Sequence, residues 1–235
     1  MQPLVLSRAI TTLFTIEQVY HFVALQSIAS YYTIYSYSNY ELKKGEKMSK
    51  VLVIVGTTRN GRSGRKVADW YLSEATKVAP ADMELELLDV SDFNLELFNE
   101  PVSPMMHQYT DVQNKLAEKV ASADGFVFVT AEYNHSIPAS LKNFIDYLYS
   151  EWHNKAAAYV GYGATGGIRA IEHLIQIMTE LKVASVASGS DNIGINAIWE
   201  ALDENGVPKP GYVHGDIAKQ LETLSWWVNA LKAAR

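Results

Sequence analysis

The stretch GTTRNGRSGR at residues 56–65 gathers backbone amides, hydroxyl groups and cations in one short segment. It lies between an apolar run typical of a strand and a segment with helical spacing, so unpaired N–H groups and a helix dipole would meet there. Arg59, Arg62 and Arg65 add positive charge, and the segment therefore indicates a phosphate site. An ordinary turn capped by Ser63 is the alternative. The Gly-Lys-Ser/Thr ending of nucleotide-hydrolase loops is missing, which disfavours ATP hydrolysis.

A second loop, TAEYNHSIP at residues 130–138, combines a flat aromatic ring, an amide and a hydroxyl. It follows a predicted strand and precedes a helix whose start is marked by Pro138. A planar ligand could take hydrogen bonds from this segment. Alternatively, Asn134 or Ser136 satisfies local backbone groups in a structured turn.

A third loop, GYGATGG at residues 161–167, fits the dinucleotide pattern G-x-G-x-x-G through Gly161, Gly163 and Gly166. It follows the fourth predicted strand and lacks an acidic residue about 20 positions further on, which disfavours a Rossmann-type dinucleotide site. The glycines instead favour close approach of the backbone to a flat ring. A glycine-rich turn is the alternative.

Composition excludes several other kinds of chemistry. The absence of cysteine rules out disulfides, thiolate zinc sites and thiol nucleophiles, and the six histidines show no ligand-like pairing, so we expect no metal site. A net charge of -6 disfavours broad binding to nucleic acid or anionic membranes. No apolar run approaches the ~18 residues of a membrane helix. We therefore expect a cytoplasmic protein.

Strand and helix patterns alternate from residue 50 and would place the three loops at one edge of a sheet. The predicted strands are 51–55, 83–90, 125–130, 156–160 and 183–187. The predicted helices are 63–77, 110–121, 140–152, 167–181 and 216–233, with a long irregular loop at 91–107. Five strands with intervening helices predict an α/β fold with a doubly wound parallel sheet. Ligands bind such sheets at the carboxyl ends of the strands.

The first 47 residues differ from the rest. Residues 1–40 hold only two charges and six of the fourteen tyrosines. The sequence KKGE at 43–46 can be encoded by a purine run containing AAGGAG, which resembles a ribosome-binding sequence upstream of Met48. We therefore expect Met48 to be the true start of the protein, residues 1–47 to be translated leader sequence, and residues 48–235 to be one domain. A genuine extension that packs on the domain or on a partner is the alternative.

Together the loops resemble the NADPH-dependent FMN reductase family. The resemblance spans about residues 50–185 and rests on GTTR with Arg62 and Ser63, EYNHSIP with the following LKN and Asp146, and GATGGIRA. It implies a flavodoxin-like fold with five parallel strands in the order 2-1-3-4-5. Two positions depart from the family pattern: Ala131 replaces a proline, and Thr57 replaces a serine but keeps the hydroxyl.

The resemblance also implies that the three loops bind FMN. The phosphate would be held by the first loop, through Thr57, Arg59 and Ser63 with support from Thr58, Gly61 and Arg62. The isoalloxazine and ribityl groups would be lined by Glu132, Tyr133, Asn134 and Ser136, and their far rim by Gly163, Gly166, Gly167 and Arg169.

The implied reaction passes electrons from NADPH or NADH through FMN to a quinone, flavin or azo compound by a ping-pong mechanism. Since the cofactor carries this chemistry, no catalytic side chain is assigned. A flavodoxin-like electron carrier without NAD(P)H oxidation, and a flavin-free regulatory protein on the same fold, are the alternatives.

The resemblance and the aromatic residues together predict a homodimer or a dimer of dimers. The predicted helix 140–152 carries more aromatic surface than one sheet face would hide. The loop 192–209, with Trp199, would border the flavin of the partner. Trp226 and Trp227 are expected to pack in the core and at the interface.

Overall fold

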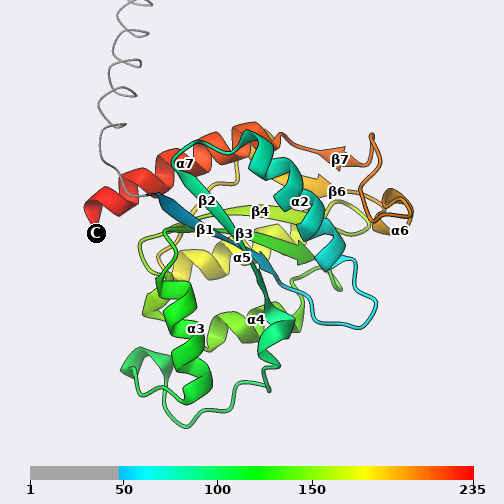
Figure 1. Ribbon diagram of the computed structural model, residues 1–235. Helices are drawn as coiled ribbons and strands as arrows, with labels where there is room; N and C mark the ends of the chain where they lie inside the picture. The colour runs from blue at the N-terminus through cyan, green and yellow to red at the C-terminus, as the bar shows by residue number, and fades with distance from the viewer. Residues whose placement is uncertain (1–47) are drawn as a thin grey trace, which may run out of the picture. The chain divides into compact units, whose positions relative to one another are not determined.

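The computed structural model describes residues 48–235, and the expected leader at residues 1–47 lies outside the described part. The described residues form one sheet with helices on both faces (Figure 1). The strands are β1 (Ser49–Val55), β2 (Met83–Asp89), β3 (Gly125–Ala131), β4 (Ala156–Tyr162), β5 (Ala184–Ser185), β6 (Ile193–Ile195) and β7 (Val213–His214). The helices are α2 (Gly64–Val78), α3 (Asp111–Ala121), α4 (Ala139–Asp146), α5 (Ile168–Glu180), α6 (Ile198–Ala201) and α7 (Ile217–Ala234).

The strands follow the order β2-β1-β3-β4-β6-β7, and β5 also pairs with β4. All pairs are parallel except β6 with β7. The predicted α/β class and flavodoxin-like order are therefore confirmed. Residues 51–55 of β1 are completely buried, as expected for a strand with both faces covered.

The predicted fifth strand, 183–187, is divided into two parts. After β5 the chain leaves β4 and passes through a 3₁₀ turn at Gly189–Asp191 before β6 returns to it. At the gap, the Gln220 side-chain amide of α7 donates to the carbonyl oxygens of Tyr159 (2.9 Å) and Asp191 (2.5 Å). The side chain of a distant helix thus replaces part of the strand ladder, and β7 adds an antiparallel edge that was not predicted.

Two layers of helices complete the core. Helices α2 and α7 cover the face formed by the odd-numbered valines of β1, and α3, α4 and α5 cover the face of Leu52 and Ile54 (Figure 1). Figure 1 shows α2 and α7 lying side by side on their face of the sheet. This arrangement leaves the carboxyl ends of β1, β3 and β4 to carry the loops.

The predicted helix 140–152 is shorter than expected. Helix α4 ends at Asp146, and a 3₁₀ turn at Ser150–Trp152 follows. Trp152 is fully buried and packs edge-on against Phe126 at a centroid distance of 5.1 Å. Tyr147 is buried as well. The aromatic surplus that suggested a dimer contact is therefore largely covered by the domain's own core.

The prediction that Trp226 and Trp227 pack in the core was wrong, and their packing at an interface stays a prediction. Helix α7 turns Leu221, Leu224 and Val228 toward the sheet. The two tryptophans lie off this stripe, with 65% and 38% of their surface exposed.

Candidate functional site

The three predicted loops meet at one edge of the sheet. In register, Val55 of β1 lies beside Val129 of β3, which lies beside Val160 of β4. Hydrogen bonds extend this pairing beyond the strands, from Gly56 N to Val129 O (3.0 Å) and from Glu132 N to Tyr162 O (3.0 Å). The expected convergence of the loops is thus present.

The first loop presents donors and one cation at the start of α2. Ser63 precedes the helix, and its side chain makes no capping bond within the described residues. Gly61 has a φ of +69°, and nothing lies within 4 Å of the place a Cβ would occupy. Arg59 is exposed and donates through Nε to the Tyr133 hydroxyl (3.3 Å), a contact that raises the pKa of the guanidinium. An anion could approach these groups from solvent.

Thr57 points inward rather than into this loop. It is fully buried, and its Oγ1 lies 3.2 Å from the Tyr162 hydroxyl. A Cβ on Gly64 would overlap Thr57 Oγ1 and lie 2.6 Å from that hydroxyl, so only glycine lets α2 begin here. Burial raises the pKa of Tyr162 to about 12, so the phenol stays protonated well above neutral pH. Gly64 and Tyr162 were not predicted as site residues.

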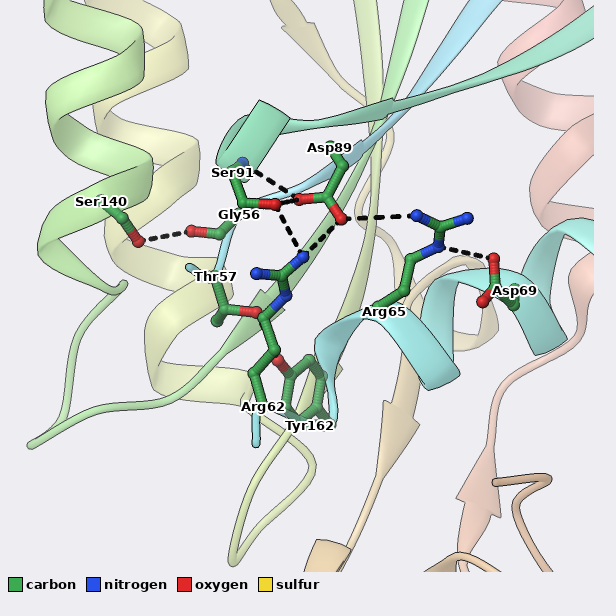
Figure 2. A network of polar contacts seen from close by, with 9 residues as sticks. All are labelled: Gly56, Thr57, Arg62, Arg65, Asp69, Asp89, Ser91, Ser140 and Tyr162. Atoms are coloured by element: carbon green, nitrogen blue, oxygen red, sulfur yellow. Dashed lines mark hydrogen bonds and ion pairs between the residues drawn. The ribbon is translucent and has the colours of Figure 1, made fainter. Parts of the chain in front are cut away.

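Two of the three arginines in the first loop are paired with carboxylates (Figure 2). Arg62 Nη2 lies 2.5 Å from Asp89 Oδ2, and Arg65 Nε lies 2.9 Å from Asp69 Oδ1. Within residues 48–235, Arg59 alone of the three has no ion-pair partner. The sequence indicated three available positive charges, whereas Asp89 and Asp69 balance two of them. The sequence did contain a signal for the Arg62–Asp89 contact. Asp89 ends β2 and pairs in register with Val55, the residue that leads into the first loop.

The second loop is a tight two-residue turn. Tyr133 and Ser136 exchange backbone hydrogen bonds of 2.9 and 3.1 Å, and Asn134 and His135 between them have φ values of 49° and 74°. These values fit a type I′ turn, which places the exposed Asn134 at the tip. The Ser136 hydroxyl is engaged by His173 Nδ1 of α5 at 3.0 Å.

Glu132 and Arg169 connect the second loop to the start of α5. The Glu132 carboxylate pairs with Arg169 Nη2 and accepts a hydrogen bond from the Arg169 backbone N–H at 3.3 Å. Only 5% of the Glu132 side chain is exposed. Both residues therefore brace the loops. The resemblance implies that they also line the two sides of the flavin, which stays a prediction.

The glycines of the third loop allow the loop to pack closely on the protein itself. Gly166 and Gly167 both have a φ of +70°. A Cβ would lie 2.8 Å from Asn196 Oδ1 at Gly166 and 2.6 Å from Tyr162 N at Gly167. Gly163 lies against Glu132, where a Cβ would stand 3.3 Å from the Glu132 Cβ.

A segment after β6 lines the outer side of the third loop. The backbone N–H of Ile198 donates to Gly163 O (3.2 Å), and that of Ala197 donates to Ala164 O (3.2 Å). This contact places α6 beside the site, with Trp199 at 69% exposure. The structure thus puts Trp199 near its own chain's third loop.

One of two cavities described in residues 48–235 lies next to these loops. A polar one of about 250 Å³ adjoins the first loop and is lined by Thr58, Val90, Ser91, Asn94, Leu95, Ser140 and Asn143. A more apolar groove of about 320 Å³ lies farther away, between Met105, Ile145 and Ile177. Within residues 48–235, no group of three or more His, Asp or Glu side chains could hold a metal ion. No helix in the same range is long and apolar enough to cross a membrane.

Comparison with known proteins gives a consistent result. Residues 49–195 match the family model of NADPH-dependent FMN reductases. The chain is 38% identical over 146 residues to the NAD(P)H-dependent FMN reductase ntnL of Nectria sp., covering 58% of this chain and 72% of that protein. It is 31% identical over 189 residues to the NAD(P)H-dependent FMN reductase PA1204 of Pseudomonas aeruginosa, covering 78% and 97%.

Among solved structures, the fold is similar to that of FerB, a flavoenzyme NAD(P)H:(acceptor) oxidoreductase from Paracoccus denitrificans. The TM-score is 0.55 at 21% identity, over 79% of this chain and 98% of that one. The family model spans most of the described domain, and both of these curated relatives exceed 30% identity over more than two thirds of their own length. The chain therefore belongs to the NADPH-dependent FMN reductase family, whose members are flavin-dependent oxidoreductases.

Proposed function

We propose that residues 48–235 form an NAD(P)H-dependent FMN oxidoreductase that reduces a quinone, a free flavin or an azo compound. The observation that carries this proposal is the meeting of the first loop with the Tyr133–Asn134 turn at the carboxyl edge of the sheet. One loop offers a phosphate its cation and helix N-terminus. The other offers an aromatic ring and an amide to a planar group.

The residues at this edge fit FMN. Arg59 is free of carboxylate partners in the described range, and Ser63 leaves its hydroxyl and the first N–H groups of α2 available. The Nε group of Arg62 is buried and makes no hydrogen bond within residues 48–235. Thr57 fits less directly, because its hydroxyl already faces Tyr162.

When bound, FMN would supply the redox chemistry of a ping-pong exchange between NADPH or NADH and the acceptor. The protein's own part is binding and orientation. Arg59 and the start of α2 would neutralise the phosphate, and the Glu132–Arg169 ion pair holds the base of the second loop in place. No side chain is given a proton-transfer role.

Titration of the purified chain with FMN, followed by NADPH and NADH oxidation assays with benzoquinone, tests the proposal. We expect a yellow protein that oxidises at least one nucleotide and turns over with the quinone. A yellow protein inert toward both nucleotides would indicate an electron carrier. A colourless protein that does not bind FMN would indicate a flavin-free function.

We also propose that the protein is a homodimer or a dimer of dimers. Support comes from Met105, Met106 and Leu97, which are between 56% and 79% exposed on the long segment before α3. Met105 also lines the apolar groove. A monomeric mass by light scattering at micromolar concentration would contradict this proposal.

Two further proposals concern the chain as it occurs in the cell. The first is that the protein is cytoplasmic, where it would have access to reduced nicotinamide nucleotides, and cell fractionation tests this location.

The second is that translation starts at Met48, so that residues 1–47 are leader sequence. The intact mass of the natively expressed protein tests it, and a mass that includes residue 1 would contradict a start at Met48.

A further inference from the structure

A buried carboxylate lies directly beside the proposed phosphate loop. Asp89 ends β2, and only 1% of its side chain is exposed. Its Oδ2 accepts from Arg62 Nη2 at 2.5 Å, and its Oδ1 accepts from the backbone N–H of Ser91 at 3.0 Å and from the Ser91 hydroxyl at 2.8 Å. Arg62 Nη2 also donates to Ser91 Oγ at 2.8 Å, so three side chains close a ring of hydrogen bonds (Figure 2).

A negative charge at this place should by itself weaken the binding of a phosphate. Through the ring of hydrogen bonds, however, the Asp89 carboxylate can favour phosphate binding, because it holds Arg62 in place. It fixes the long Arg62 side chain, which is 18% exposed, against Asp89 and Ser91 (Figure 2). A guanidinium held in advance loses less conformational freedom when a ligand binds.

Arg62 keeps donors for such a ligand. Its guanidinium carries five N–H groups, and the bonds to Asp89 and Ser91 both use Nη2. The Nε group is buried without a partner in the described part of the chain.

We propose that Asp89 is a positioning residue for FMN, acting through Arg62 and Ser91 to fix the phosphate loop. This inference rests on the proposed function, since it assumes that the first loop binds the phosphate. Asp89 does not itself touch the ligand.

Asp69 provides a matched control. It is exposed, lies one turn into α2 and pairs with Arg65, whose Nη1 also lies 3.7 Å from Asp89 Oδ2. Asp69→Asn removes the same unit of charge but leaves the ring of Asp89, Arg62 and Ser91 intact. A purely electrostatic role for Asp89 predicts tighter FMN binding in both variants. The positioning role predicts weaker FMN binding in Asp89→Asn alone.

The experiment measures dissociation constants for FMN and for riboflavin, which has the same ring without the phosphate, by fluorescence titration of the full chain. We expect Asp89→Asn to weaken FMN binding about tenfold, near the lower end of the roughly 10–100-fold losses that follow when hydrogen-bond partners of metal ligands are removed. Riboflavin binding should stay unchanged, and Asp69→Asn should bind FMN at least as tightly as the wild type. Ser91→Ala, which removes only the linking hydroxyl, should weaken FMN binding less, but in the same direction.

The inference is overturned if Asp89→Asn and Ser91→Ala both bind FMN as tightly as the wild type or more tightly. It is also overturned if the variants lose FMN and riboflavin binding to the same extent. A wild-type chain that does not bind FMN would instead overturn the proposed function, and this inference with it.

Discussion

Gly64 provides a direct test of the packing beneath the proposed phosphate loop. In Gly64→Ala, the new methyl group would overlap Thr57 Oγ1 and lie 2.6 Å from the Tyr162 hydroxyl. Tyr162 would have to retreat by about 1 Å to reach the ~3.5 Å of ordinary contact. Both neighbours are buried, so the strain cannot be relieved into solvent. We expect a loss of about 1–3 kcal/mol in the free energy of unfolding, which is typical of overpacked sites.

A double-mutant cycle separates this clash from a general effect on the helix. Thr57→Ala removes the atom that the new methyl group meets first. The double variant should therefore be more stable than the sum of the single changes predicts, by about 0.5–3 kcal/mol. Urea denaturation monitored by circular dichroism measures all four proteins. This close packing of Gly64 against Thr57 and Tyr162 would be refuted if Gly64→Ala were as stable as the wild type. It would also be refuted if the effects of Gly64→Ala and Thr57→Ala on the free energy of unfolding simply added.

Three further predictions address charge, pH and the core. Arg59→Gln should weaken FMN binding by about 1.5–3 kcal/mol, the usual value for hydrogen bonds to charged groups. The free energy of unfolding should stay unchanged because the side chain is exposed, and unaltered FMN affinity in titrations would contradict the prediction. Burial lowers the pKa of Lys155 from 10.5 to about 8. Between these values the folded protein binds fewer protons than the unfolded chain, so the free energy of unfolding should rise as the pH is raised from about 8 to 10. Lys155→Met should remove part of that rise in urea titrations, and equal pH slopes in the two proteins would count against it. Trp152→Ala should lower the free energy of unfolding by about 3–5 kcal/mol because the side chain is buried, whereas Trp226→Ala should change it by no more than about 0.5 kcal/mol. Comparable melting temperatures for the two variants would contradict the burial of Trp152 and the exposure of Trp226.

The sequence predicted those elements whose patterns are local. Apolar runs such as 51–55 and 125–130 have few other uses than buried parallel strands, and both lie within observed strands. The divided fifth strand was not predictable in this way. At its break, the side chain of Gln220 donates to the carbonyl oxygens of Tyr159 and Asp191 from a helix far along the chain. The early end of α4 similarly accompanies the burial of Trp152 against strand β3.

The same distinction applies to the candidate site. The order of strands and loops was sufficient to bring residues 56–63, 132–136 and 163–167 to one edge. Their side-chain partners come from other elements, as Ser136 with His173 and Arg62 with Asp89 show. Such pairs depend on strand register and helix rotation, which a single sequence does not state directly.

These partners change how the positive charge of the first loop should be understood. Arg62 and Arg65 face Asp89 and Asp69, so their charges are largely balanced within the protein. Arg59 projects from the loop without such a partner in the described range and contacts the Tyr133 hydroxyl at the other loop. One arginine therefore supplies net charge, while another supplies a fixed geometry. On a chain with a net charge of -6, this division would confine anion binding to the loop before α2, where the helix dipole adds to Arg59.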